Sequence, residues 1–291
     1  PKAVIVAGNG PSLKQIDYRR LPKNFDVFRC NQFYFEDRYF LGKKIKAVFF
    51  NPGVFFEQYY TLKHLIQNNE YFVENIICSS FNHPTVDLEK FVQKFQAYFI
   101  DAILGYEYLK KLKAFDAYLK YKEIYENQRI TSGVYMCAVA IALGYKDIYL
   151  SGIDFYQASE ENYAFDNKKK NLLRLLPDFK NEKTLFIYHS KDIDLEALSF
   201  LQKHYHVNFY SLSPMSPLSK HFPLAPDCES TFVAPLKENY INDILIPPHF
   251  AYEKLGTIVS KKSRFKENLI YKLIKDLLRL PSDIKHYLKE K

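Results

Sequence analysis

Short apolar runs recur along the first half of the chain, and small or amide residues follow each of them. The clearest runs span residues 2–7, 26–30 and 45–50 and are rich in Val, Ile and Phe. Runs of this length between turn residues are typical of buried β-strands. The pattern predicts a sheet built from short strands, with a further strand at 76–79.

Segments with helical spacing alternate with these runs. The spacing predicts a helix over 59–68 and two helices rich in Lys, Tyr and Phe within 88–127. A run of small apolar residues at 134–143 predicts a buried helix that ends at Gly144, and a strand at 147–150 follows it. Alternation of strands and helices favours an α/β fold, here a single Rossmann-like domain with a mainly parallel sheet.

The later part of the chain changes character. Residues 155–188 show little periodicity, and we interpret them as a small lid inserted into the domain. An amphipathic helix at 194–205 and a strand at 207–211 then return to the α/β pattern. We therefore expect a nucleotide-sugar-binding domain made of residues 1–154 and 189–258, with the lid between its two parts.

Residues 259–291 form a separate basic tail. Six aliphatic residues recur there at helical spacing, at positions 269, 270, 273, 274, 277 and 278, and Pro281 is expected to end or kink the helix. From Lys254 onward the chain has eleven basic and four acidic residues, which is +7 of the formal charge of +8. Basic amphipathic helices lie on anionic membrane surfaces; docking on the body or self-association is the alternative.

Composition excludes several classes of protein. Hydrophobic residues make up 47% and charged residues 25% of the 291 residues, so wholesale disorder is excluded. The four cysteines are too far apart for a zinc ribbon or a redox pair, and they indicate a reducing compartment. No signal peptide is visible, and the longest uncharged stretch, residues 130–145, is shorter than a membrane span. The nearly neutral body predicts no nucleic-acid partner.

Polar chemistry gathers at the ends of the expected strands. The first run ends in a turn at Gly8, Asn9 and Gly10, whose backbone can approach a phosphate or a ribose. Leu13 replaces the third glycine of the dinucleotide fingerprint, which counts against a nucleotide-linked oxidoreductase or epimerase. Three successive runs end in an asparagine, at positions 9, 31 and 51. A ligand rim is favoured, and ordinary turn chemistry is the alternative.

A second candidate site precedes the buried helix. Thr131 or Ser132 is a suitable N-cap, and the free amides and positive dipole end behind it form an anion site. Arg129 adds positive charge beside it. The alternative is an ordinary cap with a surface arginine.

Four segments together resemble the Campylobacter-type bacterial sialyltransferases of glycosyltransferase family 42. They are residues 5–13 (IVAGNGPSL), 26–37 (DVFRCNQFYFED), 128–138 (QRITSGVYMCA) and 149–156 (YLSGIDFY). The resemblance covers nearly the whole chain. It implies a glycosyltransferase A-like α/β domain with a lid. It also implies inverting transfer of sialic acid from CMP-sialic acid to lipooligosaccharide. The acceptor would be galactose in α-2,3 linkage, and in a bifunctional enzyme also sialic acid in α-2,8 linkage.

The resemblance also implies roles for single residues. His189 would be the base, Tyr156 and Tyr163 would bind the departing phosphate, and Arg129 would be important in the site. The substrate-binding set would be Asn9, Asn31, Asn51, Thr131, Ser132, Gly133, Gly152, Asp154 and Phe155. Phe186 stands where the family pattern suggests a tyrosine. The chemistry agrees, because an imidazole with a pKa near 6.5 suits proton abstraction at neutral pH.

No metal or cofactor is expected. Asp192 and Asp194 imitate the Asp-x-Asp signature of metal-dependent glycosyltransferases, but we interpret the pair as a helix start. A monophosphate leaving group also needs less neutralisation than a diphosphate. The resemblance further implies a homotetramer in the cytoplasm, peripheral on the inner face of the bacterial inner membrane. A non-catalytic membrane-surface scaffold is the remaining alternative.

Overall fold

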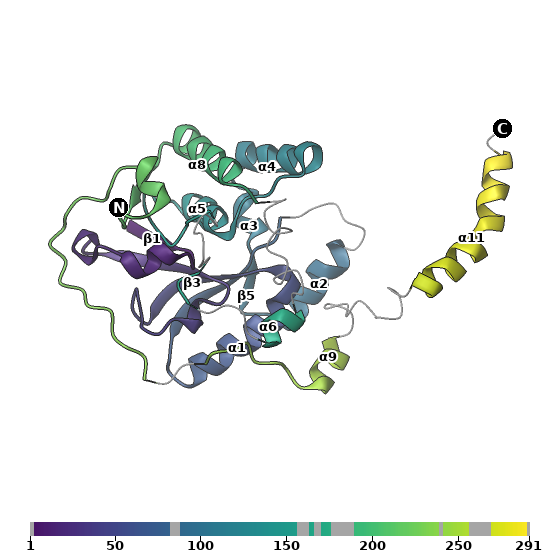
Figure 1. The fold of residues 1–291 in the computed structure, drawn as a ribbon, viewed down its shortest axis with the longest axis horizontal. Helices are drawn as coiled ribbons and strands as arrows, with labels where there is room; N and C mark the ends of the chain where they lie inside the picture. Colours follow the sequence, from purple (N-terminus) through teal and green to yellow (C-terminus); the bar gives the residue numbers. More distant parts are fainter. Residues whose placement is uncertain are drawn as a thin grey trace. The chain divides into compact units, whose positions relative to one another are not determined.

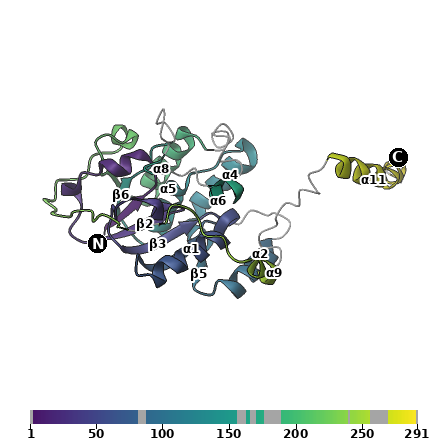
Figure 2. The same cartoon turned by 60° about the horizontal axis from the view of Figure 1, so that its bottom comes forward.

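Seven short strands form one sheet in the order β5-β4-β3-β2-β1-β6-β7, and all neighbouring strands are parallel (Figures 1 and 2). The strands are β1 (Ala3–Ala7), β2 (Phe25–Cys30), β3 (Lys44–Phe50), β4 (Phe72–Cys78), β5 (Ala102–Leu104), β6 (Asp147–Ser151) and β7 (Asn208–Ser211). The predicted α/β class is confirmed. Strand β5 was not predicted, because it has three residues and lies inside a stretch with helical spacing.

The structure, a computed structural model, describes most of the chain. The described ranges are 3–81, 88–155, 163–165, 170–175, 189–238, 241–255 and 269–289. The expected lid at 155–188 therefore lies largely outside the described residues. The chain divides into two units, residues 1–247 and 248–291.

Helices cover both faces of the sheet (Figure 1). The helices of residues 1–247 are α1 (Phe55–Gln67), α2 (Leu88–Tyr98), α3 (Tyr106–Leu109), α4 (Lys113–Glu126), α5 (Ser132–Ala142), α6 (Lys170–Leu175) and α8 (Lys191–Tyr205). The second unit contributes α9 (His249–Leu255) and α11 (Leu269–Lys289). Successive side chains of β1 alternate between the faces. Val4 and Val6 join the core under α5 and α8, whereas Ile5 joins the opposite core. Both faces are therefore apolar, as parallel sheets require.

Helix α5 has no polar face. Residues Val134 to Ala140 are all at most 1% exposed, so the helix is enclosed by the sheet and its neighbouring helices. A helix that is apolar all round is a core helix. Its N-terminus must therefore meet the carboxyl ends of the strands, and this is where the pocket lies.

The order of the strands creates a crevice beside β1. From β1 the chain builds toward β5, and then α5 carries it back to β6 on the other side of β1. In open α/β sheets, ligands bind where the strand order reverses in this way. The loops after the two strands touch: the Gly8 amide donates to Ser151 and the Gly10 amide to Gly152. A Cβ at position 8 would lie 2.3 Å from the Gly152 oxygen, so glycine is required.

The unit of residues 248–291 contains α9 and α11. Helix α11 continues through Pro281 to Lys289, so Pro281 does not end the helix, and the alternative, a kink at Pro281, stays a prediction. Proline removes one backbone donor, and here the helix continues past it. No helix in the described ranges is long and apolar enough to cross a membrane.

Candidate active site

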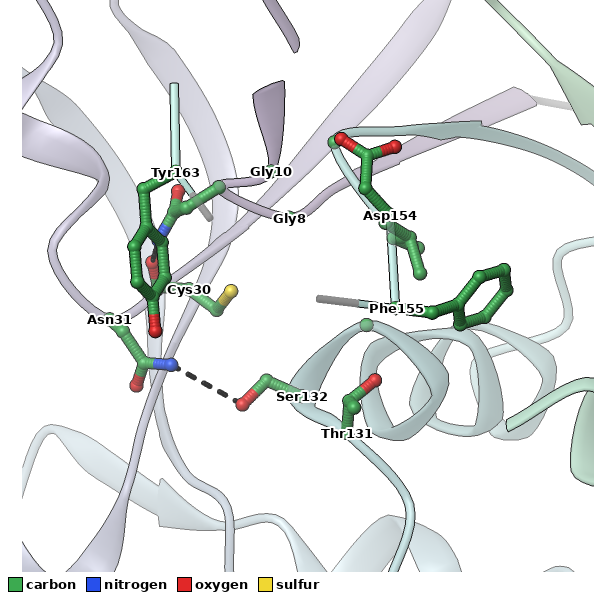
Figure 3. Close-up of a pocket in the computed structure, with 13 residues that line it drawn as sticks. Gly8, Gly10, Cys30, Asn31, Thr131, Ser132, Asp154, Phe155 and Tyr163 are labelled. Carbon is green, nitrogen blue, oxygen red and sulfur yellow. Dashed lines mark hydrogen bonds between the residues drawn. The ribbon is translucent and has the colours of Figure 1, made fainter. Parts of the chain in front are cut away.

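A pocket that is partly open to solvent lies at the carboxyl ends of β1, β2 and β6 (Figure 3). Its lining is Gly8, Asn9, Gly10, Cys30, Asn31, Thr131, Ser132, Gly133, Gly152, Ile153, Asp154, Phe155 and Tyr163. Nine of the thirteen residues to which the resemblance gives a role meet here. Asn51, Arg129 and His189 are not in the lining, and Tyr156 lies outside the described residues.

Asn9 is the polar residue of the first loop. Its side chain is 8% exposed, and its Nδ2 donates to the Cys30 carbonyl at 2.9 Å. Its Oδ1 is buried and has no hydrogen-bond partner among the described residues. A buried acceptor without a partner is costly, so this oxygen is suited to accept a hydrogen bond from a bound ligand.

Asn31 and Asn51 differ in how they fit the two alternatives, a ligand rim and ordinary turn chemistry. Asn31 has φ of 51° and lines the pocket, where its Nδ2 donates to the Ser132 hydroxyl at 3.3 Å (Figure 3). It is therefore both a turn residue and a rim residue. Asn51 instead accepts the Gly53 amide at 2.9 Å and is exposed. Its role in holding the donor stays a prediction.

Asp154 shapes the loop after β1. One carboxylate oxygen accepts the Ser12 amide at 2.7 Å, and the other accepts the Ser216 hydroxyl at 3.3 Å. A Cβ at Gly10 would lie 2.5 Å from this carboxylate. Phe155 follows with φ of 54°, a left-handed conformation that is uncommon for a bulky residue. Such strain clusters at ligand sites.

The first turn of α5 enters the pocket through Ser132 and Gly133. Gly133 packs so closely that a Cβ there would lie 2.8 Å from the Ile153 side chain. Thr131 occupies the N-cap position, and its hydroxyl donates to Asp194 at 2.6 Å. The amides and dipole of such a helix end favour an anion.

Asp192 and Asp194 do not form a metal site in the described residues. Asp192 is exposed, whereas Asp194 is fully buried and bonded to Thr131. Burial raises the pKa of Asp194 to about 7. Ser190 caps α8, because its hydroxyl accepts the Ile193 amide at 3.3 Å. Among the described residues, no group of three or more His, Cys, Asp or Glu could hold a metal ion.

His189 lies just before α8 and is tied to the segment that leads into α5. Its Nδ1 lies 3.0 Å from the Arg129 carbonyl oxygen, which can only accept, so Nδ1 carries the proton. The Nε2 atom is therefore left as the proton acceptor. Burial lowers the pKa of His189 below its usual 6.5, which keeps the imidazole neutral at neutral pH.

Arg129 contributes through its backbone as well as its side chain. Its guanidinium pairs with Glu123 at 2.5 Å, and its carbonyl orients His189. The sequence singled out its positive charge and missed the carbonyl, since backbone groups leave no trace in residue identity. Cys30 was also missed; it ends β2 just before Asn31, and burial raises its pKa to about 12.

Tyr163 is brought to the pocket by a short docked segment. The Ala164 amide donates to the Asn9 carbonyl at 2.7 Å, and the Phe165 ring contacts Phe35 edge-on at 6.1 Å. The phenol of Tyr163 is thereby held with its hydroxyl end toward the Asn31 side of the pocket (Figure 3). Phe186 lies outside the described residues.

Comparison with known families gives a match over almost the full length. Residues 2–291 match the model of the family described as alpha-2,3-sialyltransferase (CST-I). An uncharacterised protein of Haemophilus influenzae is 53% identical over 229 residues, which are 78% of this chain and 98% of that protein.

Solved structures of two Campylobacter jejuni proteins are also similar. CstII in complex with CMP-3FNeuAc is 62% identical, with a TM-score of 0.83 over 87% of this chain and 98% of CstII. CstII with a trisaccharide acceptor and CMP is 61% identical, with a TM-score of 0.80 and the same coverage. CstII has also been crystallised in a form described as monomeric. Cst-I, described as a monofunctional α-2,3-sialyltransferase, is 53% identical, with a TM-score of 0.81 over 87% of this chain and 93% of Cst-I.

Proposed function

This chain belongs to the alpha-2,3-sialyltransferase (CST-I) family and is a sialyltransferase, and we propose that it transfers sialic acid from CMP-sialic acid to a terminal galactose of lipooligosaccharide. The linkage is α-2,3, and the configuration at the sugar is inverted. The relatives support both substrates, because CstII has been crystallised with a CMP-sugar analogue and with a trisaccharide acceptor. CstII is described as an α-2,3/8 enzyme, so α-2,8 transfer to sialic acid is the second activity to test.

The pocket holds the donor. The amides of Ser132 and Gly133, at the positive end of α5, bind the phosphate. The backbone at Gly152, with Asp154 and Phe155, holds the nucleoside. Asn9 and Asn31 complete the donor contacts in the pocket, together with the methyl group and main chain of Thr131, whose hydroxyl is bonded to Asp194. Asn51 adds a contact from the loop after β3. The buried Oδ1 of Asn9 supports this assignment, because it needs a donor that the described protein groups do not supply.

His189 is the general base. The acceptor oxygen attacks the anomeric carbon, its proton passes to Nε2, and the bond between sugar and phosphate breaks with CMP taking the electron pair. One observation carries this proposal: the Arg129 carbonyl holds the proton on Nδ1 and leaves Nε2 ready to accept. Arg129 thus serves the site by orienting the base.

The hydroxyls of Tyr156 and Tyr163 stabilise the charge that develops on the leaving phosphate. Hydrogen-bond donors fixed in place act as such a stabiliser without reorganising during the reaction. A single phosphate leaves, so we propose that no divalent metal and no cofactor are needed. Transfer should survive exhaustive EDTA treatment. Inactivation that Mg²⁺ or Mn²⁺ reverses would contradict this proposal.

The basic tail binds the enzyme to a membrane surface. We place it in the cytoplasm, peripheral on the inner face of the bacterial inner membrane through α11. We also propose a homotetramer, by the family resemblance, and no nucleic-acid partner. Sedimentation velocity on the full chain tests the tetramer, and a monomer at all concentrations would refute it.

An acceptor panel tests the central proposal. The purified chain receives CMP-sialic acid with an acceptor ending in galactose, one ending in sialic acid, or none. Galactose should yield an α-2,3 product together with stoichiometric CMP. Product from the sialic acid acceptor would establish the second linkage. CMP release that is equal in all three reactions would show hydrolysis only and would refute the transferase assignment.

A further inference from the structure

Asp194 lies buried where two helices meet. Its Oδ1 accepts the Thr131 amide at 2.9 Å, and its Oδ2 accepts the Thr131 hydroxyl at 2.6 Å. Asp192, two residues earlier, is exposed to solvent. The two carboxylates of the Asp-x-Asp pair therefore differ in their surroundings. Asp192 faces solvent, whereas both oxygens of Asp194 accept hydrogen bonds from Thr131.

The bond to Asp194 changes the start of α5. A threonine at the N-cap ordinarily accepts an amide of the first turn with its own hydroxyl. Thr131 makes no such capping bond, although it is the N-cap residue. Its hydroxyl is held by Asp194 instead. The first-turn amides, which have no intrahelical partner, therefore face no competition from their own cap.

The same junction carries the candidate base. His189 is five residues before Asp194, and Nδ1 of its ring is bonded to Arg129, two residues before Thr131. Three side-chain hydrogen bonds thus join residues 129–131 to residues 189–194. Ile193, which precedes Asp194 on α8, is 1% exposed and packs in the core with α5. The junction is fixed by packing as well as by polar contacts.

We propose that Asp194 is a positioning residue that keeps the anion-binding end of α5 open by holding the Thr131 hydroxyl away from it. This inference rests on the proposed function, in which the donor phosphate binds the amides of Ser132 and Gly133. Without Asp194, the threonine hydroxyl turns to cap its own helix and competes with the phosphate. The two hydrogen bonds from Thr131 also stabilise the charged form of Asp194 against the burial that raises its pKa.

Calorimetric binding of CMP to the full chain tests the inference. Asp194→Ala should weaken the Kd about tenfold, which corresponds to about 1.4 kcal/mol. Adding Thr131→Val removes the competing hydroxyl, so the double variant should bind CMP about threefold more tightly than Asp194→Ala alone. A purely structural role of Asp194 would not be rescued by a second substitution in the same junction. Asp192→Ala is the matched control in the same motif, and its Kd should stay within about twofold of wild type.

The outcomes distinguish a failure of the proposed function from a failure of the positioning role of Asp194. If the wild-type chain does not bind CMP, the proposed function fails. If it binds CMP but Asp194→Ala leaves the Kd unchanged, or the double variant binds no more tightly, only the positioning role fails. Asp194→Asn covers the case in which the alanine variant does not fold. Its amide group can still bond both Thr131 groups, so its Kd should stay within about threefold, and a tenfold loss with native melting would overturn the inference.

Discussion

Helices α5 and α11 are both rich in aliphatic residues, yet the chain uses them in opposite ways. In α5 the apolar residues surround the axis and are enclosed in the core, and the N-terminus meets the pocket. In α11 ten apolar side chains are more than half exposed, with Lys275, Arg279 and Lys285 among the exposed residues between them. In the proposed function, catalysis and membrane binding are therefore assigned to separate units. The first is built on an enclosed helix, and the second on a helix with an apolar surface.

The largest expected effect follows from removing the base beside α5. His189→Ala should lower turnover by about 10² to 10⁴-fold, the range typical of general acid–base groups, while CMP binding and vesicle binding are kept. Steady-state transfer with CMP calorimetry measures both. His204→Ala is the control, because His204 is exposed near the end of α8 and does not line the pocket. Near-normal transfer by the His189 variant would remove this residue from the mechanism.

The next effect concerns the leaving phosphate. The double variant Tyr156→Phe, Tyr163→Phe should lose roughly 10- to 100-fold in turnover, more than it loses in donor affinity, because the hydroxyls act on charge that develops in the transition state. Rate and donor KM measured together distinguish the two. A rise in KM at constant turnover would show that the tyrosines only bind the donor. The Phe rings preserve packing, so the double variant should keep the melting temperature of the wild-type chain.

The pH profile of the reaction tests the proposed base beside α5. The proposed mechanism needs neutral His189, whose pKa is lowered by burial. Activity should therefore be present above the folded-state pKa and fall as the pH drops through it. The acid limb of kcat/KM is expected at a midpoint below pH 6.5. A midpoint clearly above that value would mean that a different group, or a different environment of His189, controls the reaction.

Truncation of the tail should have the smallest effect on turnover. Deleting residues 260–291 should leave transfer to a soluble acceptor within about twofold of the full chain, but abolish sedimentation with anionic vesicles. Each basic residue near such a surface contributes about 1 kcal/mol, and the apolar side of α11 adds to this.

A matched variant separates the two contributions of α11. Leu273→Gln with Ile274→Gln keeps every charge and should weaken vesicle binding without abolishing the electrostatic part at low salt. Unchanged vesicle binding by the truncated chain would refute the membrane role. Loss of transfer by the truncated chain would instead show that the tail is needed for catalysis as well as for membrane binding.

By itself, the sequence determined the features whose information is periodic or local. Alternation and run length predicted the strands around β1 and the enclosed helix α5, because burial of a regular element requires a matching pattern of apolar residues. The loops after β1, β2 and β6 followed, since the carboxyl ends of parallel strands share one edge of a sheet. The charged amphipathic tail was visible for the same reason.

Only the tertiary structure decided how individual groups are used. It separated Asp194 from Asp192, although both have the same local context, because the helix surface turns one inward and the other to solvent. It brought His189 to a carbonyl sixty residues earlier in the chain. It placed Asn31 in the pocket and Asn51 on a turn outside it. Contacts between distant segments and to backbone atoms leave no local pattern in the sequence. The role of each of these side chains is therefore decided only when the chain packs.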